Sequence, residues 1–280
     1  MNFTSIPALD SVLQQYHERY ASVYGPWWVS LKYPHILPWA TVAVYVSMVF
    51  GMPKLMKAVG LEKGINVSPI MKVWNLFLSV WSAAMALGTG IPYIIFMYQE
   101  GFFTGLCDER KGLYEPSTMG MWANMFVASK YLELFDTFLL IAKTPTREVP
   151  FLHWYHHTTV LLFTWYAQLY SYTGAIFMVV NATVHTFMYW YYFRMECGHK
   201  PSWAFALTIG QISQMFVGIF VNGSWMFMRW YEGRNCPCTA PGIITAACAI
   251  MYASYAFLFL QFFFKRYYSA PTVRTEKKKQ

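Results

Sequence analysis

The sequence predicts an all-α integral membrane protein, a bundle of seven transmembrane helices that encloses a polar chamber. Hydrophobic residues make up 56% of the 280 residues and aromatic residues 20%. Charged residues make up only 12%, against about 25% in a typical soluble domain. Polar residues recur at helical spacing inside several of the apolar stretches, which indicates an enclosed polar interior.

Seven apolar stretches reach the roughly 17 to 25 residues that a helix needs to cross a bilayer. They lie at 35–55, 73–98, 118–142, 153–171, 174–194, 203–228 and 240–264. The connections between them are too short to form a soluble domain. The whole chain, 1–280, is therefore predicted to be one membrane domain, with an N-terminal segment at 1–34, the helix bundle at 35–264 and a basic tail at 265–280.

Lysine and arginine are divided unevenly between the two sides of the predicted bundle. Seven spans place the termini on opposite sides; fourteen basic residues then share the side of the C-terminus and six the other, while Lys130 lies within a span. Cytosolic loops are enriched in these residues, so the C-terminus is predicted to be cytosolic. The net charge of +8 largely reflects this topology.

The C-terminal tail predicts a cellular location. The chain ends Lys277-Lys278-Lys279-Gln280, which looks like the dilysine signal that retrieves membrane proteins to the endoplasmic reticulum. The alternative is a solvated basic tail attracted to anionic lipid. We expect a multi-pass protein of the endoplasmic reticulum membrane with a lumenal N-terminus, in which only Asn2 offers a glycosylation sequon clear of the membrane.

Three cysteines fall in the predicted lumenal connections. Cys107 lies in one connection, and Cys236 and Cys238 lie in the next. Disulfides persist on this oxidising side, so we expect a bridge between Cys107 and Cys236, with Cys238 as the alternative partner. Cys197 and Cys248 are expected to be free.

The third apolar stretch carries charges at helical spacing. At 100° per residue, Lys130, Glu133, Asp136 and Thr137 fall within a sector about 120° wide, which predicts a polar stripe facing the bundle interior. Charges in a membrane are tolerated when they pair with one another or meet water, and they mark functional sites more often than not. The alternative is a neutralised network with a purely structural role.

Comparable polar faces occur in the next three stretches. They are His153, His156 and His157 in the fourth; Asn181, His185, Tyr189 and Tyr192 in the fifth; and Gln211, Gln214, Gly218 and Asn222 in the sixth. The faces of the fourth and fifth stretches span about 100° and about 80° of their helices. Four consecutive helices with narrow polar faces predict a shared polar chamber inside an apolar wall.

Four imidazoles in such a chamber suit either metal binding or acid/base and covalent chemistry. Membrane di-iron desaturases and hydroxylases hold their metals with several similar histidine boxes, and this is the alternative function that we keep. The remaining three histidines of the chain, His17, His35 and His199, lie outside the predicted chamber. Two irons would therefore be undersupplied with ligands, although the count alone leaves room for a single metal ion. We predict no metal site and no cofactor.

Four motifs resemble those of the fatty acid elongases, the condensing enzymes of very-long-chain fatty acid synthesis. They are the KxxExxDT pattern at 130–137, the HxxHH box at 153–157, the NxxVHxxMY pattern at 181–189 and the TxxQxxQ pattern at 208–214. Their order, spacing and membrane placement agree across nearly the whole chain. Trp154 and Tyr155 inside the box resemble the subgroup that acts on saturated and monounsaturated chains.

The resemblance implies a seven-helix protein of the endoplasmic reticulum with a lumenal N-terminus. It also implies a very-long-chain 3-oxoacyl-CoA synthase, an acyltransferase whose substrates are acyl-CoA and malonyl-CoA. The two would condense with loss of carbon dioxide and CoA, and the product would be a 3-oxoacyl-CoA two carbons longer. The acyl tail is expected to occupy a tunnel that runs toward the lumen, and whatever closes this tunnel would set the chain length.

The predicted site contains no cysteine near the histidine box to accept the acyl group. We therefore expect His156 to carry the acyl group as an acyl-imidazole, with malonyl-CoA decarboxylating beside His185, while His153 and His157 orient the nucleophile and exchange protons. The supporting side chains are expected to be Asn181, Tyr189, Gln211 and Gln214 as hydrogen-bond donors to substrate oxygens, and Glu133 and Asp136 as groups that fix histidine tautomers. Lys130 is expected to be a further supporting residue of the site.

Six basic residues lie near the predicted cytosolic helix ends, where the phosphates of CoA would dock. They are Lys143, Arg147, Arg194, Lys200, Lys265 and Arg266. The alternative for each is the ordinary positive charge that flanks a membrane helix. Expected partners are the bilayer, the two CoA substrates, and the reductases and dehydratase that complete the elongation cycle. A homo-oligomer is left open, and no nucleic acid is expected.

Overall fold

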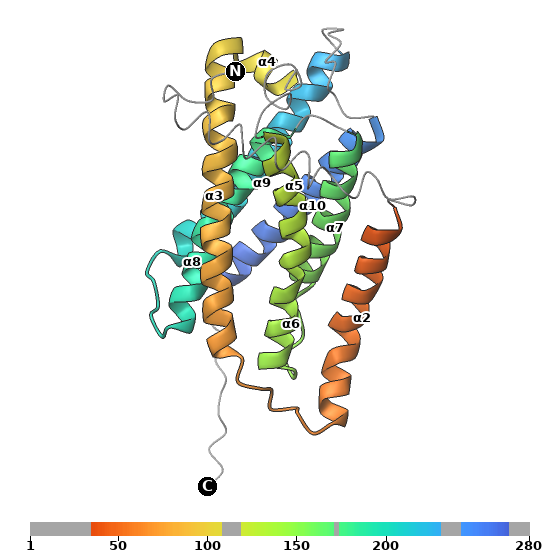
Figure 1. Cartoon of the computed structure of the whole chain (residues 1–280), viewed down its shortest axis with the longest axis vertical. Coiled ribbons are helices and arrows are strands. Elements are labelled where there is room, and N and C mark those ends of the chain that lie inside the picture. Colours follow the sequence, from red (N-terminus) through yellow and green to blue (C-terminus); the bar gives the residue numbers. More distant parts are fainter. Residues whose placement is uncertain (1–34, 108–118, 171–173, 231–241, 269–280) are drawn as a thin grey trace.

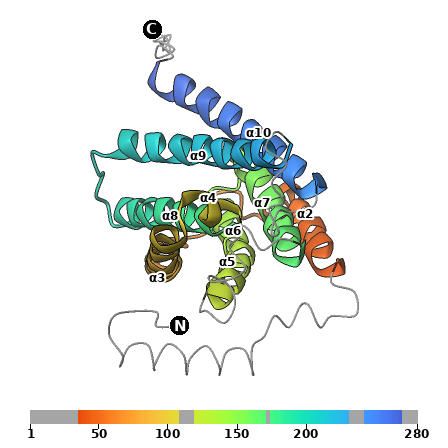
Figure 2. The ribbon, with the colours of Figure 1, turned by 90° about the horizontal axis from the view of Figure 1, so that it is seen from above.

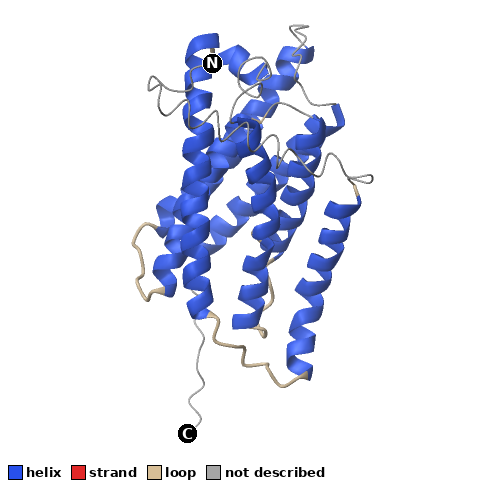
Figure 3. Ribbon diagram, in the orientation of Figure 1, coloured by secondary structure: helices blue, strands red, loops and turns tan. Residues whose placement is uncertain are grey.

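The computed structural model describes residues 35–107, 119–170, 174–230 and 242–268 (Figure 1). Within these ranges every regular element is a helix and none is a strand (Figure 3). The helices are α2 (Ile36–Ala58), α3 (Ser68–Glu100), α4 (Phe102–Cys107), α5 (Met119–Leu132), α6 (Leu134–Lys143), α7 (Phe151–Tyr170), α8 (Ala175–Glu196), α9 (Ala204–Trp230) and α10 (Gly242–Tyr267). The predicted all-α class is confirmed for this part of the chain.

Four of these helices are long and apolar enough to cross a membrane. They are α2, α3, α10 and the Ala204–Met228 part of α9. Helices also occupy the other three predicted stretches, but α5 and α6 are short, and α7 and α8 carry the histidines and amides that lower their hydropathy. The residues that suggest a site thus also weaken the signal for a membrane span.

The structure corrects the sequence prediction at two points. The predicted helix over 118–142 is two helices, because Glu133 forms a turn between α5 and α6. The amide of Glu133 still donates to the carbonyl of Ser129 at 2.8 Å, while the amide of Asp136 donates to the carbonyl of Glu133, a tighter turn. The short helix α4 was not predicted; it follows Gly101, whose φ of 86° favours glycine.

Viewed from above, the helices form a bundle with α2 at one edge beside α7, and α3 beside α8 (Figure 2). Helix α10 packs against α7 and α9, and α5 packs against α7. One cluster of buried side chains, including Met85, Met119, Ala123 and Ala182, joins α3, α5 and α8. The polar faces of α5 to α8 are thereby directed into the bundle.

One end of the bundle is held together by polar contacts between helix ends. Glu196 at the end of α8 accepts a hydrogen bond from Ser68 of α3 at 2.8 Å and forms an ion pair with Lys143 of α6. The loop between α2 and α3 closes on the same end, where the amide of Ile65 donates to the carbonyl of Ala142 at 2.9 Å. Gly64, with φ of 79°, packs so closely on this backbone that no side chain fits.

Candidate active site

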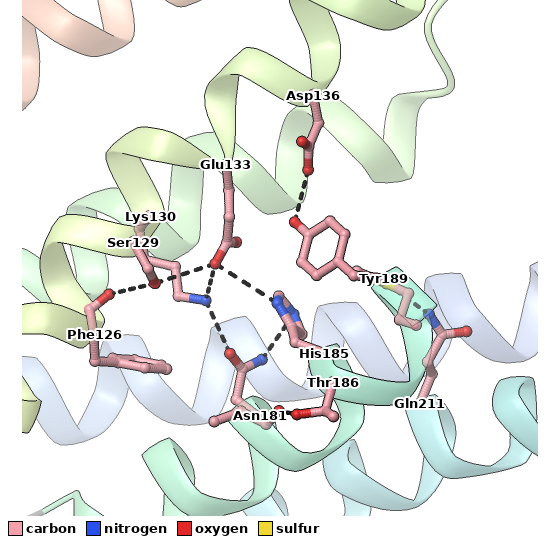
Figure 4. A network of polar contacts seen from close by, with 12 residues as sticks. Phe126, Ser129, Lys130, Glu133, Asp136, Asn181, His185, Thr186, Tyr189 and Gln211 are labelled. Carbon is pink, nitrogen blue, oxygen red and sulfur yellow. Dashed lines mark hydrogen bonds and ion pairs between the residues drawn. The ribbon is translucent and has the colours of Figure 1, made fainter. Parts of the chain in front are cut away.

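Four side chains, from α5, from the turn that follows it and from α8, form a buried polar network at the centre of the site (Figure 4). The ammonium of Lys130 lies 2.7 Å from Oε1 of Glu133 and donates to Oδ1 of Asn181 at 2.9 Å. Nδ1 of His185 lies 3.6 Å from the same carboxylate oxygen. Lys130 is 1% exposed and Glu133 2%, so the pair is shielded from water and lipid alike.

Lys130 fixes the orientation of the Asn181 amide and, through it, the tautomer of His185. An ammonium group only donates hydrogen bonds, so the amide oxygen of Asn181 must face Lys130. Its nitrogen then faces Nε2 of His185 at 3.2 Å. Nε2 accepts this hydrogen bond, which leaves the ring proton on Nδ1, directed at Glu133. Glu133 thus lies where a group that fixes the tautomer of His185 must lie.

Among the described residues, Asp136 forms its hydrogen bonds with a tryptophan and a tyrosine and none with a histidine. Its two carboxylate oxygens accept hydrogen bonds from Nε1 of Trp74 and from the hydroxyl of Tyr189, each at 2.6 Å. The single hydroxyl proton of Tyr189 is therefore already donated to Asp136 (Figure 4). In this arrangement the carboxylate of Asp136 is bound by Trp74 and Tyr189 instead of an imidazole, and the roles expected of Asp136 and Tyr189 stay predictions.

The three histidines of α7 form a row of rings. The ring centroids of His153 and His157 are 4.6 Å apart, and those of His156 and His157 are 5.6 Å apart. Nε2 of His153 lies 2.8 Å from Oγ1 of Thr137, which in turn lies 3.0 Å from the hydroxyl of Tyr45. Nδ1 of His156 and Nδ1 of His157 are buried and have no hydrogen-bond partner among the described residues.

A cavity opens between α5, α7, α8, α9 and α10, with an empty volume of about 1030 Å³ including its mouth. His156, Asn181 and Gln214 line one part of it, and the carbonyl oxygen of Gln214 has no partner within the described residues. His185 is not part of the wall and reaches it through Asn181. Gln211, whose amide contacts Sδ of Met188 at 3.4 Å, is not part of the wall either.

The rest of the cavity wall is mainly apolar. Along α10 the wall runs from Tyr255, whose ring lies 4.9 Å from that of His156, to Ile244. Eleven residues of helix correspond to about 17 Å. At the far end Trp225 lines the cavity, and its indole nitrogen donates to the carbonyl of Leu106 in α4 at 2.8 Å. The cavity wall thus includes His156 beside Tyr255 and, at the far end, a tryptophan fixed by a hydrogen bond, together with a few further polar residues such as Thr245.

The basic residues proposed for CoA differ in their surroundings. Lys143 is engaged by Glu196. Arg147, Lys200, Lys265 and Arg266 are exposed. Arg194 is half-buried, and its Nε has no partner in the described part of the chain. All six lie at or just beyond the ends of α6, α8 and α10, so the structure gathers them at one end of the bundle.

Several predictions fall outside the described residues. Cys236, Cys238, Asn2 and the tail Lys277–Gln280 are among them, so the expected disulfide, glycan and retrieval signal stay predictions. Cys197 and Cys248 are free, as expected. Over the described ranges, no three side chains of His, Cys, Asp and Glu come together as a metal ion would require.

Three side chains of the site were missed from the sequence: Tyr45 of α2, Trp74 of α3 and Ser129 of α5. Ser129 donates to Glu133 at 3.2 Å. Tyr45 and Trp74 lie in stretches that read as lipid-facing or apolar, and the packing of α2 against α6 and of α3 against α8 brings them to the motifs. Ser129 directly precedes Lys130, four residues before Glu133, and this helical spacing could have identified it.

Comparison with known proteins identifies the family. Residues 11–280 match the family described as ELO: GNS1/SUR4 family. The chain belongs to this family. The resemblance that the four motifs predicted is thereby confirmed, and the site above is that of an ELO family protein.

Characterised relatives of this ELO family chain carry consistent names. Fatty acid elongase 3 of Trypanosoma brucei brucei is 34% identical over 284 residues, which cover 89% of this chain and 91% of that protein. Fatty acid elongase 2 of the same organism is 35% identical over 247 residues, 84% and 89% of the two chains. Very long chain fatty acid elongase 6 of Homo sapiens is 35% identical over 228 residues, 80% and 82% of the two chains.

Replacement of Lys130 by methionine is expected to destabilise the protein strongly. Removing one partner of a buried ion pair leaves the other charge uncompensated and typically costs about 3 to 5 kcal/mol. The matched control is Lys143→Met at the Lys143–Glu196 pair, where the lysine side chain is 38% exposed and the expected loss is at most about 1 kcal/mol. Thermal unfolding of both variants in detergent measures the difference; equal losses would contradict the buried network.

Proposed function

We propose that this protein is a fatty acid elongase that condenses a long-chain acyl-CoA with malonyl-CoA. In this proposal it is a very-long-chain 3-oxoacyl-CoA synthase, and its product is a 3-oxoacyl-CoA two carbons longer. The observation that carries the proposal is the position of His156, which lies where the polar part of the cavity meets a long apolar wall and has a ring nitrogen without a partner within the described residues. Such a ring can take an acyl group whose tail fills the apolar part.

The reaction balances without a metal or cofactor. A ring nitrogen of His156 attacks the thioester carbonyl carbon of acyl-CoA, the C–S bond breaks, and CoA leaves as the thiol with the ring proton. Malonyl-CoA then loses carbon dioxide, and the electron pair of the broken C–C bond forms an enolate. The enolate carbon attacks the acyl-imidazole carbonyl, the C–N bond breaks, and the imidazole of His156 regains a proton from the medium.

Two amides of the cavity wall can stabilise the negative charge that develops on substrate oxygens during these reaction steps. Nδ2 of Asn181 uses one of its hydrogens on His185 and keeps a second for a thioester or enolate oxygen. Gln214, 8% exposed and on the same wall, offers a further amide. Preorganised donors of this kind typically contribute about 2.7 to 4 kcal/mol each to transition-state stabilisation. His185, tied to Asn181, holds the amide in place beside the reacting groups.

The size of the cavity supports a long-chain substrate. Its apolar length of about 17 Å exceeds the roughly 15 Å of one leaflet of the bilayer core, which the tail of a membrane lipid fills. Trp225 and α4 stand at the far end, and the buried cluster of Leu106, Val221, Trp225 and Met228 backs this wall. An acyl tail can therefore extend from His156 until it meets Trp225.

We infer further that the chain crosses the endoplasmic reticulum membrane seven times, with a lumenal N-terminus and a cytosolic C-terminus. The supporting observation is that α5 and α6 follow one another through Glu133, and their 25 residues together reach about 37 Å, enough for one crossing. The basic helix ends then face the cytosol and CoA, and the other enzymes of the elongation cycle take the product onward.

The central test is elongation by microsomes that contain this protein, supplied with labelled malonyl-CoA and a panel of acyl-CoAs. We expect products two carbons longer from long-chain substrates. Without malonyl-CoA, labelled acyl-CoA should leave the label on the purified protein at His156 and release free CoA. The variant His156→Ala should lose both label and product, whereas full labelling of that variant would contradict the acyl-imidazole.

A second experiment tests whether the cavity holds the acyl tail. A methyl group at Gly218 of α9 would fall 2.3 Å from the ring of Tyr252, which lines the cavity and stacks on Phe177 at 5.2 Å. Gly218→Ala is expected to push Tyr252 from its place and to lower kcat/KM for long-chain acyl-CoA about tenfold, in line with overpacking costs of about 1 to 3 kcal/mol.

The matched control for this experiment is Gly223→Ala on the same helix. There an added methyl group meets no atom within 4 Å, so activity should stay close to that of the unmodified protein. Equal activities of the two variants would show that the acyl tail lies elsewhere.

A third experiment tests the far wall. Trp225→Leu removes the indole ring and its hydrogen bond to Leu106, and is expected to lengthen the products by at least one two-carbon unit. Trp190→Leu, at a tryptophan that is 40% exposed on α8, serves as the control. Gas chromatography of the products measures the distribution, and an unchanged upper limit in Trp225→Leu would exclude Trp225 as the end of the tunnel.

A further inference from the structure

Helix α2 contributes one buried polar side chain to the site, although it carries none of the four motifs. Tyr45 is 3% exposed, and its hydroxyl lies 3.0 Å from Oγ1 of Thr137 on α6. The same Oγ1 lies 2.8 Å from Nε2 of His153 on α7. Three helices thus meet in a chain of two hydrogen bonds that ends on the histidine box.

The direction of this chain follows from counting hydrogens. Tyr45 makes no other hydrogen bond to the described residues, and neither does Thr137, which is fully buried. If His153 donated to Thr137, one of the two buried hydroxyl hydrogens would have no acceptor. A buried donor without a partner typically costs about 1 to 3 kcal/mol.

Only one arrangement gives each hydroxyl hydrogen an acceptor. Tyr45 donates to Oγ1 of Thr137, and Thr137 donates to Nε2 of His153. Nε2 of His153 then carries the lone pair, and the neutral ring holds its proton on Nδ1. The chain of hydroxyl groups therefore selects one tautomer of His153.

The ring whose tautomer is selected, that of His153, lies beside the other two histidine rings of α7. The ring of His153 lies 4.6 Å from that of His157, which is followed at 5.6 Å by the ring of His156. The ring of Tyr45 also packs edge-on to His157, at 6.2 Å between centroids. His153 can accept no further proton at Nε2 without breaking the bond to Thr137, so Nδ1 is the ring nitrogen that can donate.

We propose that Tyr45 and Thr137 are positioning residues of the condensation reaction. They hold His153 with its proton on Nδ1, and so fix the proton position of one ring in the row of histidines that contains the acyl carrier His156. This inference rests on the proposed function of His156. It assigns α2 a part in the chemistry as well as in the packing of the bundle.

The test compares variants that keep volume but remove the hydroxyl groups. Tyr45→Phe and Thr137→Val should lower kcat about tenfold or more, as loss of a tautomer-fixing group does elsewhere, while KM for both CoA substrates stays within about twofold. Thr137→Ser, which keeps the hydroxyl, should restore kcat to within about threefold of the unmodified protein, an order-of-magnitude expectation from the same logic.

The matched control removes another hydrogen bond between α2 and α7. Nε1 of Trp39 donates to the hydroxyl of Tyr166 at 2.9 Å, ten residues along α7 from His156, and Tyr166→Phe should leave kcat unchanged. Two outcomes would overturn the proposal: normal kcat in Tyr45→Phe, or an equal fall in Tyr166→Phe, which would make the attachment of α2 the cause.

A readout that does not depend on activity separates this proposal from the proposed function. Nitrogen NMR of the protein with labelled histidine, with His153 assigned from its loss in His153→Gln, should show the His153 proton on Nδ1 and a change in Tyr45→Phe. A proton on Nε2 in the unmodified protein would refute the inference. A protein with the expected tautomer but no elongation activity would refute the proposed function alone.

Discussion

The buried ammonium of Lys130 is the constraint on which the rest of the site depends. A charge at this depth is tolerated only with compensating partners, and Glu133 and Asn181 supply them. The pairing has a directional consequence, because a group that only donates dictates which end of the Asn181 amide faces it. The amide nitrogen of Asn181 then faces His185. The need to neutralise the charge of Lys130 on α5 therefore also determines the direction of the hydrogen bonds on α8.

The cavity shows how the same bundle separates two kinds of chemistry. Three motif side chains, His156, Asn181 and Gln214, line the cavity, whose wall is otherwise mainly apolar and includes Trp225. In the proposed reaction the thioester meets these three groups and the alkyl tail lies along the apolar wall. The other motif imidazoles, those of His153, His157 and His185, are not part of the cavity wall.

Helical spacing predicted which faces of the motif helices point inward, and burial of Lys130, Glu133 and Thr137 agrees with that prediction. Spacing on one helix says nothing of what stands opposite. The partners of Asp136 come from α3 and α8, and those of Thr137 from α2 and α7, so neither could be read from a stripe. The hydrogen bond from Tyr189 to Asp136 could not be predicted for this reason. The prediction of an unbroken helix through Glu133 was wrong because the turn there depends on local hydrogen bonding.

Where hydroxyl groups are as deeply buried as those of Tyr45 and Thr137, the balance of donors and acceptors fixes the tautomer of a neighbouring histidine. At a protein surface, water would accept the hydroxyl hydrogen of Tyr45 and no direction would follow. Inside the bundle the hydrogen can go only to Thr137, and that of Thr137 only to His153. In the same way, the hydrogen bond from Asn181 to Nε2 of His185 places the ring proton of His185 on Nδ1. Two histidines on different helices thus receive a defined proton position from neighbours that need not touch the substrate, which explains why a lipid-facing helix such as α2 retains one buried hydroxyl.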